Sequence, residues 1–491
     1  MDYREHSMKK IRLKNYLYPV ILLLLCLFPS VGMLWHPTTE AIGNSTGAAK
    51  PVLRTSEGWN IEYLTELQNY LEDHFAYRPE LISAQAHLQG SVFGTSAADG
   101  VIYGQNNVLY YEATLDDYQK KNLSSDRQLF NMAHNVYLMQ EYTQLLGKNF
   151  IFTIAPNKNS LYADNMPERL QVQVGEKSDA ERLLPYLEAE GVRYVDLFAL
   201  FRAQKENLYY LRDSHWNNKG ALLVYNTLMD AAGIDHERYD AVIPEQMEYS
   251  GDLNEMLYPV WGNTETDYRF LKEPSYEILQ EDATVESDFV STFNPSGSGN
   301  LLMYRDSFGN TLIPYFAEHY ASAVFSKRVP YTMTDLVTYA PDTVIVEKVE
   351  RHIQTLGSVP PQMSAPERFL AEETGYADVS AEPVCQEEAV VKWEKDGIYL
   401  KLRGGIPEGI LKENGKIYAE FTDATGESHL YEAFDINFNA GITTDYGFLL
   451  YYPLLDSDGS LKPEHFQVRV LGETPDGLRV MWRGEIREEG Q

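Results

Sequence analysis

Cysteine and positive charge are both scarce in this chain. Of its 491 residues only two are cysteine, Cys26 and Cys385, which excludes a disulfide framework and a zinc site built from cysteine. The 41 Lys and Arg residues are outnumbered by 72 Asp and Glu residues, so the formal net charge is −31. A surface this acidic repels phosphate backbones, and we therefore expect no binding to nucleic acid.

Spacings typical of metal ligands are missing as well. The 11 histidines form no His-x-x-x-His or His-x-His pair, and the acidic runs resemble solvated surface. The segment 456–460, Asp-Ser-Asp-Gly-Ser, is too short for a complete calcium loop and is better explained as a turn. We expect no metal and no other cofactor.

Apolar residues are nevertheless plentiful enough for folded cores. Hydrophobic residues make up 44% of the chain and aromatic residues 12%, which excludes a chain that is disordered throughout. A length of 491 residues is typical of two or three domains.

The N-terminus has the pattern of a membrane anchor. An uncharged stretch from residue 16 to residue 35 is long enough to cross a hydrocarbon core of about 30 Å as a helix. It is preceded by four basic residues, Lys9, Lys10, Arg12 and Lys14. This order predicts a cytoplasmic tail and single-pass signal anchor over residues 1–36, with the bulk of the chain outside the cell membrane. A cleaved signal peptide is the alternative, although no small-x-small site follows closely.

Composition divides the remainder into four parts. Residues 37–58, rich in Gly, Ser, Thr and Pro, are expected to form a flexible linker. Residues 59–356 alternate strand-like and helix-like segments, which predicts an α/β domain with a parallel sheet covered by helices on both faces. The proline-bearing stretch 357–379 is a second linker, and residues 380–491 have the short alternating runs typical of an antiparallel β-sandwich.

Individual elements of the α/β domain can be predicted too. Buried strands are expected at 150–155, 300–304 and 343–346, with a weaker candidate at 192–197. Helices are expected at 59–76, 127–146 and 218–232, the last closed by Gly233. The segment 236–299 interrupts this alternation and is expected to be an insertion that shapes a rim, with short strands at 268–271 and 276–279.

The first chemically suggestive motif is Asp213-Ser214-His215-Trp216, directly before the helix expected at 218–232. A carboxylate two residues before a histidine can orient the imidazole and stabilise its charged form, as the orienting residue and base of a catalytic triad do. With 11 histidines in the chain, an Asp-x-His pair also arises by chance. A surface or structural histidine therefore remains an alternative.

A candidate nucleophile follows the strand expected at 300–304. Arg305 and Asp306 lead from this strand to Ser307, and ligands of an open α/β sheet bind beyond the carboxyl ends of its strands. The N–H groups at the start of a following helix could stabilise an oxyanion. The alternative is that Asp306 or Ser307 only caps that helix, in which Pro314 is an irregularity unless the helix starts late or kinks.

Together these motifs resemble the SGNH-hydrolase-like family of alginate-type polysaccharide O-acetyltransferases, which includes a group named for an Asp-His-His-Trp motif. The resemblance covers about residues 60–355 and rests on short segments in the family's order: DHFAYR at 73–78, GVIYGQNNVLYY at 100–111, TIAPNKNSLY at 153–162, DSHW at 213–216, GDL at 251–253, RDSF at 305–308 and VIVEKVER at 344–351. Ser214 departs from the second residue of the group's motif.

The resemblance implies an SGNH-like, flavodoxin-like sheet and a catalytic triad. In that triad Ser307 is the nucleophile, His215 the general base and Asp213 the residue that orients the base, an order permuted relative to ordinary SGNH esterases. Further residues could bind substrate: Lys158, Tyr162, Trp216, Arg305 and Arg351. Structural roles, such as a strand-end salt bridge or a stacked tyrosine, remain alternatives for Lys158, Tyr162 and Arg351.

The activity implied by the resemblance is transfer of an acetyl group, through an acetyl-serine, to a hydroxyl of a cell-surface or secreted polysaccharide. Because acetyl-CoA is cytoplasmic, it also implies a membrane-bound acyltransferase partner that supplies the acetyl group. An acetyl esterase with the same triad is one alternative. Another is a non-catalytic glycan-binding or scaffold protein of exopolysaccharide assembly, whose C-terminal aromatic residues would stack on sugars, although alternating aromatic positions are more often core.

Overall fold

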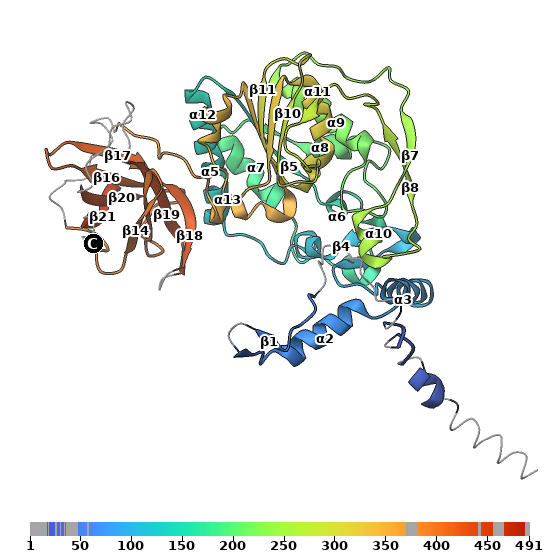
Figure 1. Ribbon diagram of the computed structural model, residues 1–491. Helices are drawn as coiled ribbons and strands as arrows, with labels where there is room; N and C mark the ends of the chain where they lie inside the picture. The colour runs from blue at the N-terminus through green and yellow to red at the C-terminus, as the bar shows by residue number, and fades with distance from the viewer. Residues whose placement is uncertain are drawn as a thin grey trace, which may run out of the picture.

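The computed structural model describes residues 17, 19–24, 27–29, 31–33, 35, 48–55, 58–369, 382–439, 443–454 and 466–486. Within these residues an α/β part and an all-β part lie side by side (Figure 1). The α/β part is built on a seven-stranded sheet, and the all-β part contains two four-stranded sheets.

The seven-stranded sheet has the order β6-β5-β13-β11-β12-β10-β9. Its strands are β5 (Asn149–Ala155), β6 (Tyr194–Val195), β9 (Glu277–Ile278), β10 (Phe289–Phe293), β11 (Asn300–Tyr304), β12 (Ser322–Ser326) and β13 (Thr343–Val349). Pairing is parallel from β6 to β12, whereas β10 pairs antiparallel with both of its neighbours, β12 and β9. Because parallel strands end at the same edge, the loops that follow β5, β11 and β13 come together there.

Helices cover both faces of this sheet. They are α5 (Asp126–Leu145), α7 (Asp179–Glu190), α8 (Leu197–Arg202), α9 (Asn218–Ala232) and α11 (Ile313–His319). Phe152 of β5 packs in a buried cluster with residues of α5 and α7, whereas the adjacent Ile151 packs in the opposite cluster with residues of α8, α9 and α11. A strand that is apolar on both faces is typical of a buried parallel sheet. The predicted α/β architecture is confirmed.

Most of the predicted elements are present. The three strands with clear signals coincide with β5, β11 and β13, and the weak candidate at 192–197 is reduced to the two residues of β6. Within the insertion 236–299, β8 and β9 overlap the strands expected at 268–271 and 276–279, whereas β10, which pairs with the antiparallel neighbours β12 and β9, was not predicted. Strand β12 was missed, since its apolar run spans only Ala323, Val324 and Phe325.

The helix ends follow from local chemistry. Ser125 caps α5, and Asn217 caps α9, each by accepting a bond from the backbone N–H of the third helical residue. Gly233 ends α9 in the left-handed region at φ 73°, as expected. The helix expected at 59–76 is shorter, α2 (Tyr63–His74), and all its side chains are exposed or half-buried.

Shorter elements complete the α/β part. They are β1 (Arg54–Thr55), β2 (Gly58–Trp59), α3 (Arg78–Phe93), β3 (Val101–Tyr103), η1 (Gln105–Asn107), β4 (Leu109–Tyr111), η2 (Glu112–Thr114), α4 (Leu115–Gln119), α6 (Lys158–Leu161), η3 (Ala163–Asn165), η4 (Glu168–Leu170), β7 (Glu245–Tyr249), α10 (Asp252–Leu257), β8 (Glu265–Arg269), η5 (Ser307–Thr311), α12 (Asp335–Tyr339), η6 (Glu350–His352) and α13 (Thr355–Ser358). Strands β3 and β4 form an antiparallel pair, as do β7 and β8.

The all-β part is a sandwich of two antiparallel sheets, ordered β14-β15-β19-β18 and β17-β16-β20-β21. The strands are β14 (Val390–Asp396), β15 (Tyr399–Gly405), β16 (Ile417–Thr422), β17 (Ser428–Glu432), β18 (Phe434–Asn439), β19 (Thr443–Pro453), β20 (Phe466–Thr474) and β21 (Gly477–Ile486). Leu402 and Leu450 from one sheet share a buried cluster with Phe421 and Val468 from the other, so the sheets pack face to face. The predicted antiparallel architecture is confirmed.

Most of the aromatic residues considered for sugar stacking belong to the interior of the all-β part. The buried ones are Tyr399, Tyr418, Tyr431, Tyr451 and Tyr452. These residues therefore give little support to a sugar-binding face on the sandwich.

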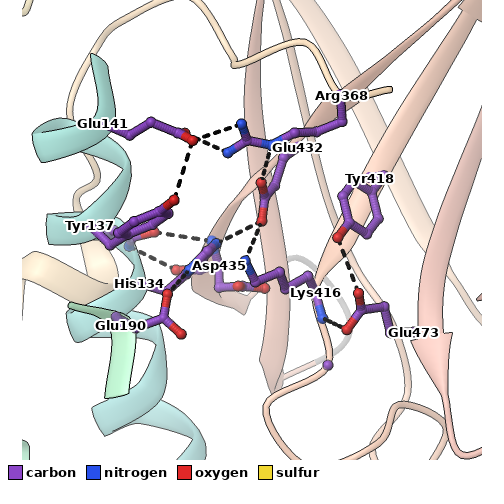
Figure 2. Close-up of polar contacts among 12 residues, drawn as sticks. His134, Tyr137, Glu141, Glu190, Arg368, Lys416, Tyr418, Glu432, Asp435 and Glu473 are labelled. Atoms are coloured by element: carbon purple, nitrogen blue, oxygen red, sulfur yellow. Dashed lines mark hydrogen bonds and ion pairs between the residues drawn. The ribbon is translucent and has the colours of Figure 1, made fainter. Parts of the chain in front are cut away.

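A buried polar network joins the two parts (Figure 2). Nδ1 of His134, on α5, lies 2.7 Å from Glu190, and Nε2 lies 3.1 Å from Glu432 of β17. Arg368 pairs with both Glu432 and Glu141. Burial disfavours the charged imidazole, but the two carboxylates outweigh burial and raise the pKa of His134 to about 9. His134 is therefore protonated at neutral pH and carries part of the attraction between the two parts.

The anchor expected at 16–35 falls partly outside the described residues, as does the acidic turn at 456–460. Short pieces of the anchor, such as 19–24 and 27–29, are helical. In the described part of the chain, no helix combines the length and apolar character needed to cross a membrane.

The His134 network predicts a loss of stability at alkaline pH. A group whose pKa rises from 6.5 to about 9 on folding contributes its full stabilisation below about pH 6.5 and loses it as the pH rises through about 9. Melting temperatures measured from about pH 6 to about pH 10 should fall at the alkaline end in the wild type and change less in His134→Gln. His429→Gln, at an exposed ion pair with Glu367, is the matched control and should behave as the wild type. An equally steep alkaline decline in His134→Gln would contradict the prediction.

Candidate active site

An alcohol, an imidazole and a carboxylate line up beyond the carboxyl end of β11. Ser307 begins η5, and His215 lies in the loop that leads to α9. Nε2 of His215 is 2.8 Å from Oγ of Ser307, and Nδ1 of His215 is 2.7 Å from Oδ1 of Asp213. A neutral imidazole whose Nδ1 proton is held by the carboxylate presents the lone pair of Nε2 to the hydroxyl. This arrangement can remove a proton from the serine.

The carboxylate of Asp213 is only 1% exposed and is surrounded by donors. Oδ1 also accepts a bond from the backbone N of His215 at 2.8 Å, while Oδ2 accepts from Tyr249 Oη and the backbone N of Asp252, both at 2.8 Å. Burial opposes ionisation, but His215 and these N–H groups outweigh it and lower the pKa of Asp213. In turn the carboxylate raises the pKa of His215 against the effect of burial. The carboxylate of Asp213 is therefore placed to stabilise a protonated His215.

Asp252 ties the Asp-Ser-His-Trp loop to α10. Its carboxylate accepts bonds from the backbone N and Oγ of Ser214 at 2.9 and 2.6 Å and lies 3.7 Å from Nδ1 of His215. A Cβ at Gly251 would lie 2.4 Å from the carbonyl oxygen of Arg212, so this close approach requires glycine. The hydrogen bond from Ser214 Oγ to Asp252 therefore gives the Ser214 side chain a structural role.

Polar groups at the end of β13 hold the turn that carries Ser307. Asp306 accepts a bond from the backbone N of Val349 at 2.8 Å, and its own backbone N donates to Glu347 at 2.9 Å. Although burial opposes ionisation of Asp306, His352 and other partners lower its pKa. Burial, followed by the charge of Asp306, raises the pKa of Glu347 to about 7. Hydrogen bonds to the neighbouring strand β13 therefore hold this turn in place.

The capping explanation for Asp306 and Ser307 is not supported, since no side chain of the described residues caps η5. The regular helix α11 begins only at Ile313, which places Pro314 in its first turn. A missing N–H is tolerated there, because the first N–H groups of a helix have no partner within it.

Arg305 is 1% exposed and connects the serine turn to the insertion. Its Nη2 donates to the carbonyls of Val285 and Ser287 at 3.0 and 2.8 Å, and its Nη1 donates to Oδ1 of Asn310. Because a guanidinium can only donate, it fixes the amide oxygen of Asn310 and leaves Nδ2 directed away. Asn310 stands three residues after Ser307 in a 3₁₀ turn, where such residues share a face.

Two cavities meet at the Ser307–His215 pair. Cavity 1, of about 500 Å³, is lined mainly by apolar and aromatic side chains, among them Tyr210, Tyr249, Phe270, Tyr276 and Tyr315. Cavity 2, of about 770 Å³, mixes polar groups with aromatic rings and includes Tyr111, Tyr258, Trp261, Lys327 and Arg351. Ser307, His215 and Asn310 line both. A covalently bound group on Ser307 would therefore be accessible from two sides.

Of the residues predicted to bind substrate, the structure places only Arg351 on a cavity, among the residues that it describes. The guanidinium of Arg351 lies 5.4 Å from the ring centroid of Tyr111. The other four make hydrogen bonds that hold segments near the candidate site in place: Lys158, Tyr162, Trp216 and Arg305.

The ammonium group of Lys158 binds backbone carbonyl groups and does not line either cavity. Its Nζ donates to the carbonyls of Leu109, Leu211 and Asp213 at 2.6, 2.8 and 3.0 Å. Burial lowers the pKa of Lys158 to about 7. These bonds connect the β3–β4 hairpin with the loop of the candidate base.

Trp216 fixes the other side of this loop. The buried indole donates to Oγ1 of Thr311 at 2.7 Å, and its ring centroid lies 4.8 Å from that of Phe308. Tyr162 accepts a bond from the backbone N of Leu208 at 3.4 Å. Both side chains therefore help to hold the backbone near the candidate base in place, and neither lines cavity 1 or cavity 2.

The sequence analysis assigned no role to Tyr249, Asp252 or Asn310. Asp252 had a signal in the Gly-Asp-Leu segment, but Tyr249 and Asn310 had none. Metal binding is an alternative role for Asp213, His215 and Asp252, because their donor atoms lie within 4.8 Å of one another. The hydrogen bonds already made by these atoms favour proton transfer instead.

Comparison with known proteins identifies the family of the α/β part. Residues 101–296 match the family described as "SGNH hydrolase-like domain, acetyltransferase AlgX". Over these residues, less than half of the chain, the match indicates an SGNH hydrolase-like domain of the AlgX acetyltransferase type. The matched range contains Asp213 and His215 and ends shortly before Ser307. Among curated protein sequences, none matches the chain.

Several solved structures show a distant likeness. A DHHW family protein from Eubacterium siraeum is 15% identical over 45% of this chain and 85% of its own, with a TM-score of 0.36. The O-acetyltransferase domain of Pseudomonas putida AlgJ is 15% identical over 52% and 92%, with a TM-score of 0.36. Pseudomonas aeruginosa AlgX is 12% identical over 81% and 95%, with a TM-score of 0.33. Likenesses this distant do not assign an activity.

Lys158→Met should destabilise the fold without weakening substrate binding. Three carbonyls, two of them in buried bonds, would lose the Lys158 donor, so the free energy of unfolding measured in urea should fall by about 2–4 kcal/mol. Lys219→Met, at an exposed ion pair with Glu206, is the matched control and should change it by less than about 0.5 kcal/mol. A raised KM with unchanged stability would instead indicate a direct role of Lys158 in binding.

Proposed function

We propose that this chain is a serine O-acyltransferase that acetylates hydroxyl groups of a polysaccharide outside the cell membrane. The observation that carries the proposal is the unbroken path of hydrogen bonds from Ser307 through His215 to Asp213 beside two cavities. The match of residues 101–296 to an acetyltransferase domain supports acetyl as the transferred group.

The first half-reaction forms an acyl-enzyme. Nε2 of His215 takes the proton of Ser307 while Oγ attacks the carbonyl carbon of the donor ester. The tetrahedral intermediate then collapses, the bond from the acyl carbon to the donor oxygen breaks, and the imidazolium returns its proton to that oxygen. Asp213 stays ionised throughout and stabilises the imidazolium.

The second half-reaction repeats these steps with a sugar hydroxyl. The hydroxyl loses its proton to His215, and its oxygen forms a bond to the acyl carbon. The bond between the acyl carbon and Oγ breaks, and Ser307 recovers the proton from the imidazolium. One ester is exchanged for another, so atoms and electrons balance without a further reactant.

Asn310 supplies a donor for the oxyanion in this proposal. Its amide oxygen is occupied by Arg305, and its Nδ2 has no hydrogen-bond partner among the described residues. Asn310 shares a face of η5 with Ser307 and lines both cavities with it. A donor that is already oriented before the reaction stabilises developing negative charge without reorganisation.

The proposal also includes the cellular setting. The basic residues followed by the apolar stretch 16–35 support an N-terminal anchor with the α/β part outside. Because acetyl-CoA is cytoplasmic, the donor ester would come from a membrane-bound acyltransferase that passes acetyl groups outward.

Ser307→Ala should abolish acyl-enzyme formation. With p-nitrophenyl acetate as donor, mass spectrometry should detect one added acetyl group on the wild type and none on Ser307→Ala, and His215→Ala should slow p-nitrophenol release by about 10⁴-fold. Ser91→Ala, at an exposed serine on α3, is the matched control. Undiminished release by Ser307→Ala would refute the assignment of the nucleophile.

Asn310→Ala should lower kcat for p-nitrophenol release by about 10²–10³-fold, because the oxyanion loses a donor. Asn310→Asp is the sharper variant, since a carboxylate can still accept from Arg305 but can only repel an oxyanion, and it should be at least as impaired. Unchanged melting temperatures would exclude a folding defect. Wild-type kcat in Asn310→Asp would contradict the donor role.

A further inference from the structure

Cavity 2 contains an aromatic side chain that the fold presents to solvent. Trp261 is 61% exposed although its backbone lies in the left-handed region at φ 59°, a conformation unfavourable for a bulky residue. No hydrogen bond or ring contact of its indole occurs within the described part of the chain. Surrounding structure must therefore impose this conformation.

The backbone around Trp261 is held on three sides. Ser83 Oγ accepts a bond from the backbone N of Val260 at 3.0 Å, and Oδ1 of Asn254 accepts from the backbone N of Asn263 at 3.3 Å. Nε2 of His87 lies 3.1 Å from the carbonyl oxygen of Trp261. The loop is thus fixed while the indole stays free, which is the arrangement of a preformed stacking surface.

The rings and charges of cavity 2 indicate what could bind there. Tyr111 and Tyr258 line the cavity together with Trp261, and so do polar residues such as Ser250 and Asn254. Carbon–hydrogen faces of a pyranose pack against aromatic rings, while its hydroxyls need hydrogen-bond partners.

Charge restricts the ligand further. Three acidic residues, Asp252, Glu255 and Glu286, line cavity 2 together with only two basic residues, Lys327 and Arg351. The whole chain has a net charge of −31, which repels polyanions as they approach. Both features disfavour a polyuronate and favour an uncharged glycan.

We propose that cavity 2 binds the acceptor as a neutral polysaccharide, with one pyranose ring stacked on Trp261 and a nearby hydroxyl directed at acylated Ser307. Cavity 1, which is more apolar, takes the acyl donor from the other side. This inference rests on the proposed function, since it names the acceptor of the same site.

The two half-reactions can be measured separately to test this. Donor use is followed as the burst of p-nitrophenol from p-nitrophenyl acetate, and transfer as acetylation of added cello- or chito-oligosaccharides. Trp261→Ala should keep the burst within about twofold and raise KM for the oligosaccharide about tenfold, a change of about 1.4 kcal/mol. Trp261→Phe, which keeps an aromatic face, should recover most of the transfer. Trp59→Ala, at a 72% exposed tryptophan on β2, is the matched control.

The outcomes separate this inference from the proposed function. Unchanged transfer by Trp261→Ala, preference for oligogalacturonate over the neutral oligosaccharides, or a wild type that forms the acyl-enzyme but acetylates neither neutral series would overturn the inference and leave the acyl-enzyme intact. Absence of a Ser307-dependent burst would refute the proposed function itself.

Discussion

The buried carboxylate of Asp213 is the interaction on which the candidate site depends. An ion removed from water is tolerated only when its lone pairs accept hydrogen bonds, and those of Asp213 accept from His215, Tyr249 and Asp252. The donors belong to the loop itself, to β7 and to the start of α10. The orientation of the imidazole is therefore determined by how the insertion 236–299 folds against the loop, and the bonds that compensate for burial also keep Nε2 directed at Ser307.

The loops of the candidate site could be located from the sequence because their signals are local. Asp213 and His215 lie two residues apart, and Ser307 follows an apolar run that becomes β11. Helix α9 also has the predicted ends, since a capping asparagine and a terminal glycine determine helix boundaries at short range. The distance between Ser307 and His215 could not be derived in this way, because it depends on how separate segments of the chain pack together.

Two residues considered for substrate binding show why the sequence left structural roles open. Lys158 and Arg305 were expected to bind substrate, but their charged ends donate to backbone carbonyls of distant segments. A cation near a strand end has the same appearance in a sequence whether its partner is a ligand or a carbonyl. The same limit applies to β10, which the sequence analysis did not predict and which pairs with β12 and β9 at this end of the sheet.

Helix α5 belongs to both parts of the molecule, because it covers the central sheet with one side and contacts the sandwich with the other (Figure 1). Arg127 bonds to Asp435, and Asn135 exchanges bonds with the backbone of the same residue. A fragment cut after the α/β part would turn this polar, desolvated surface of α5 toward water with its partners gone. The sandwich accordingly completes the hydrogen bonding of polar groups on α5 that face away from the central sheet.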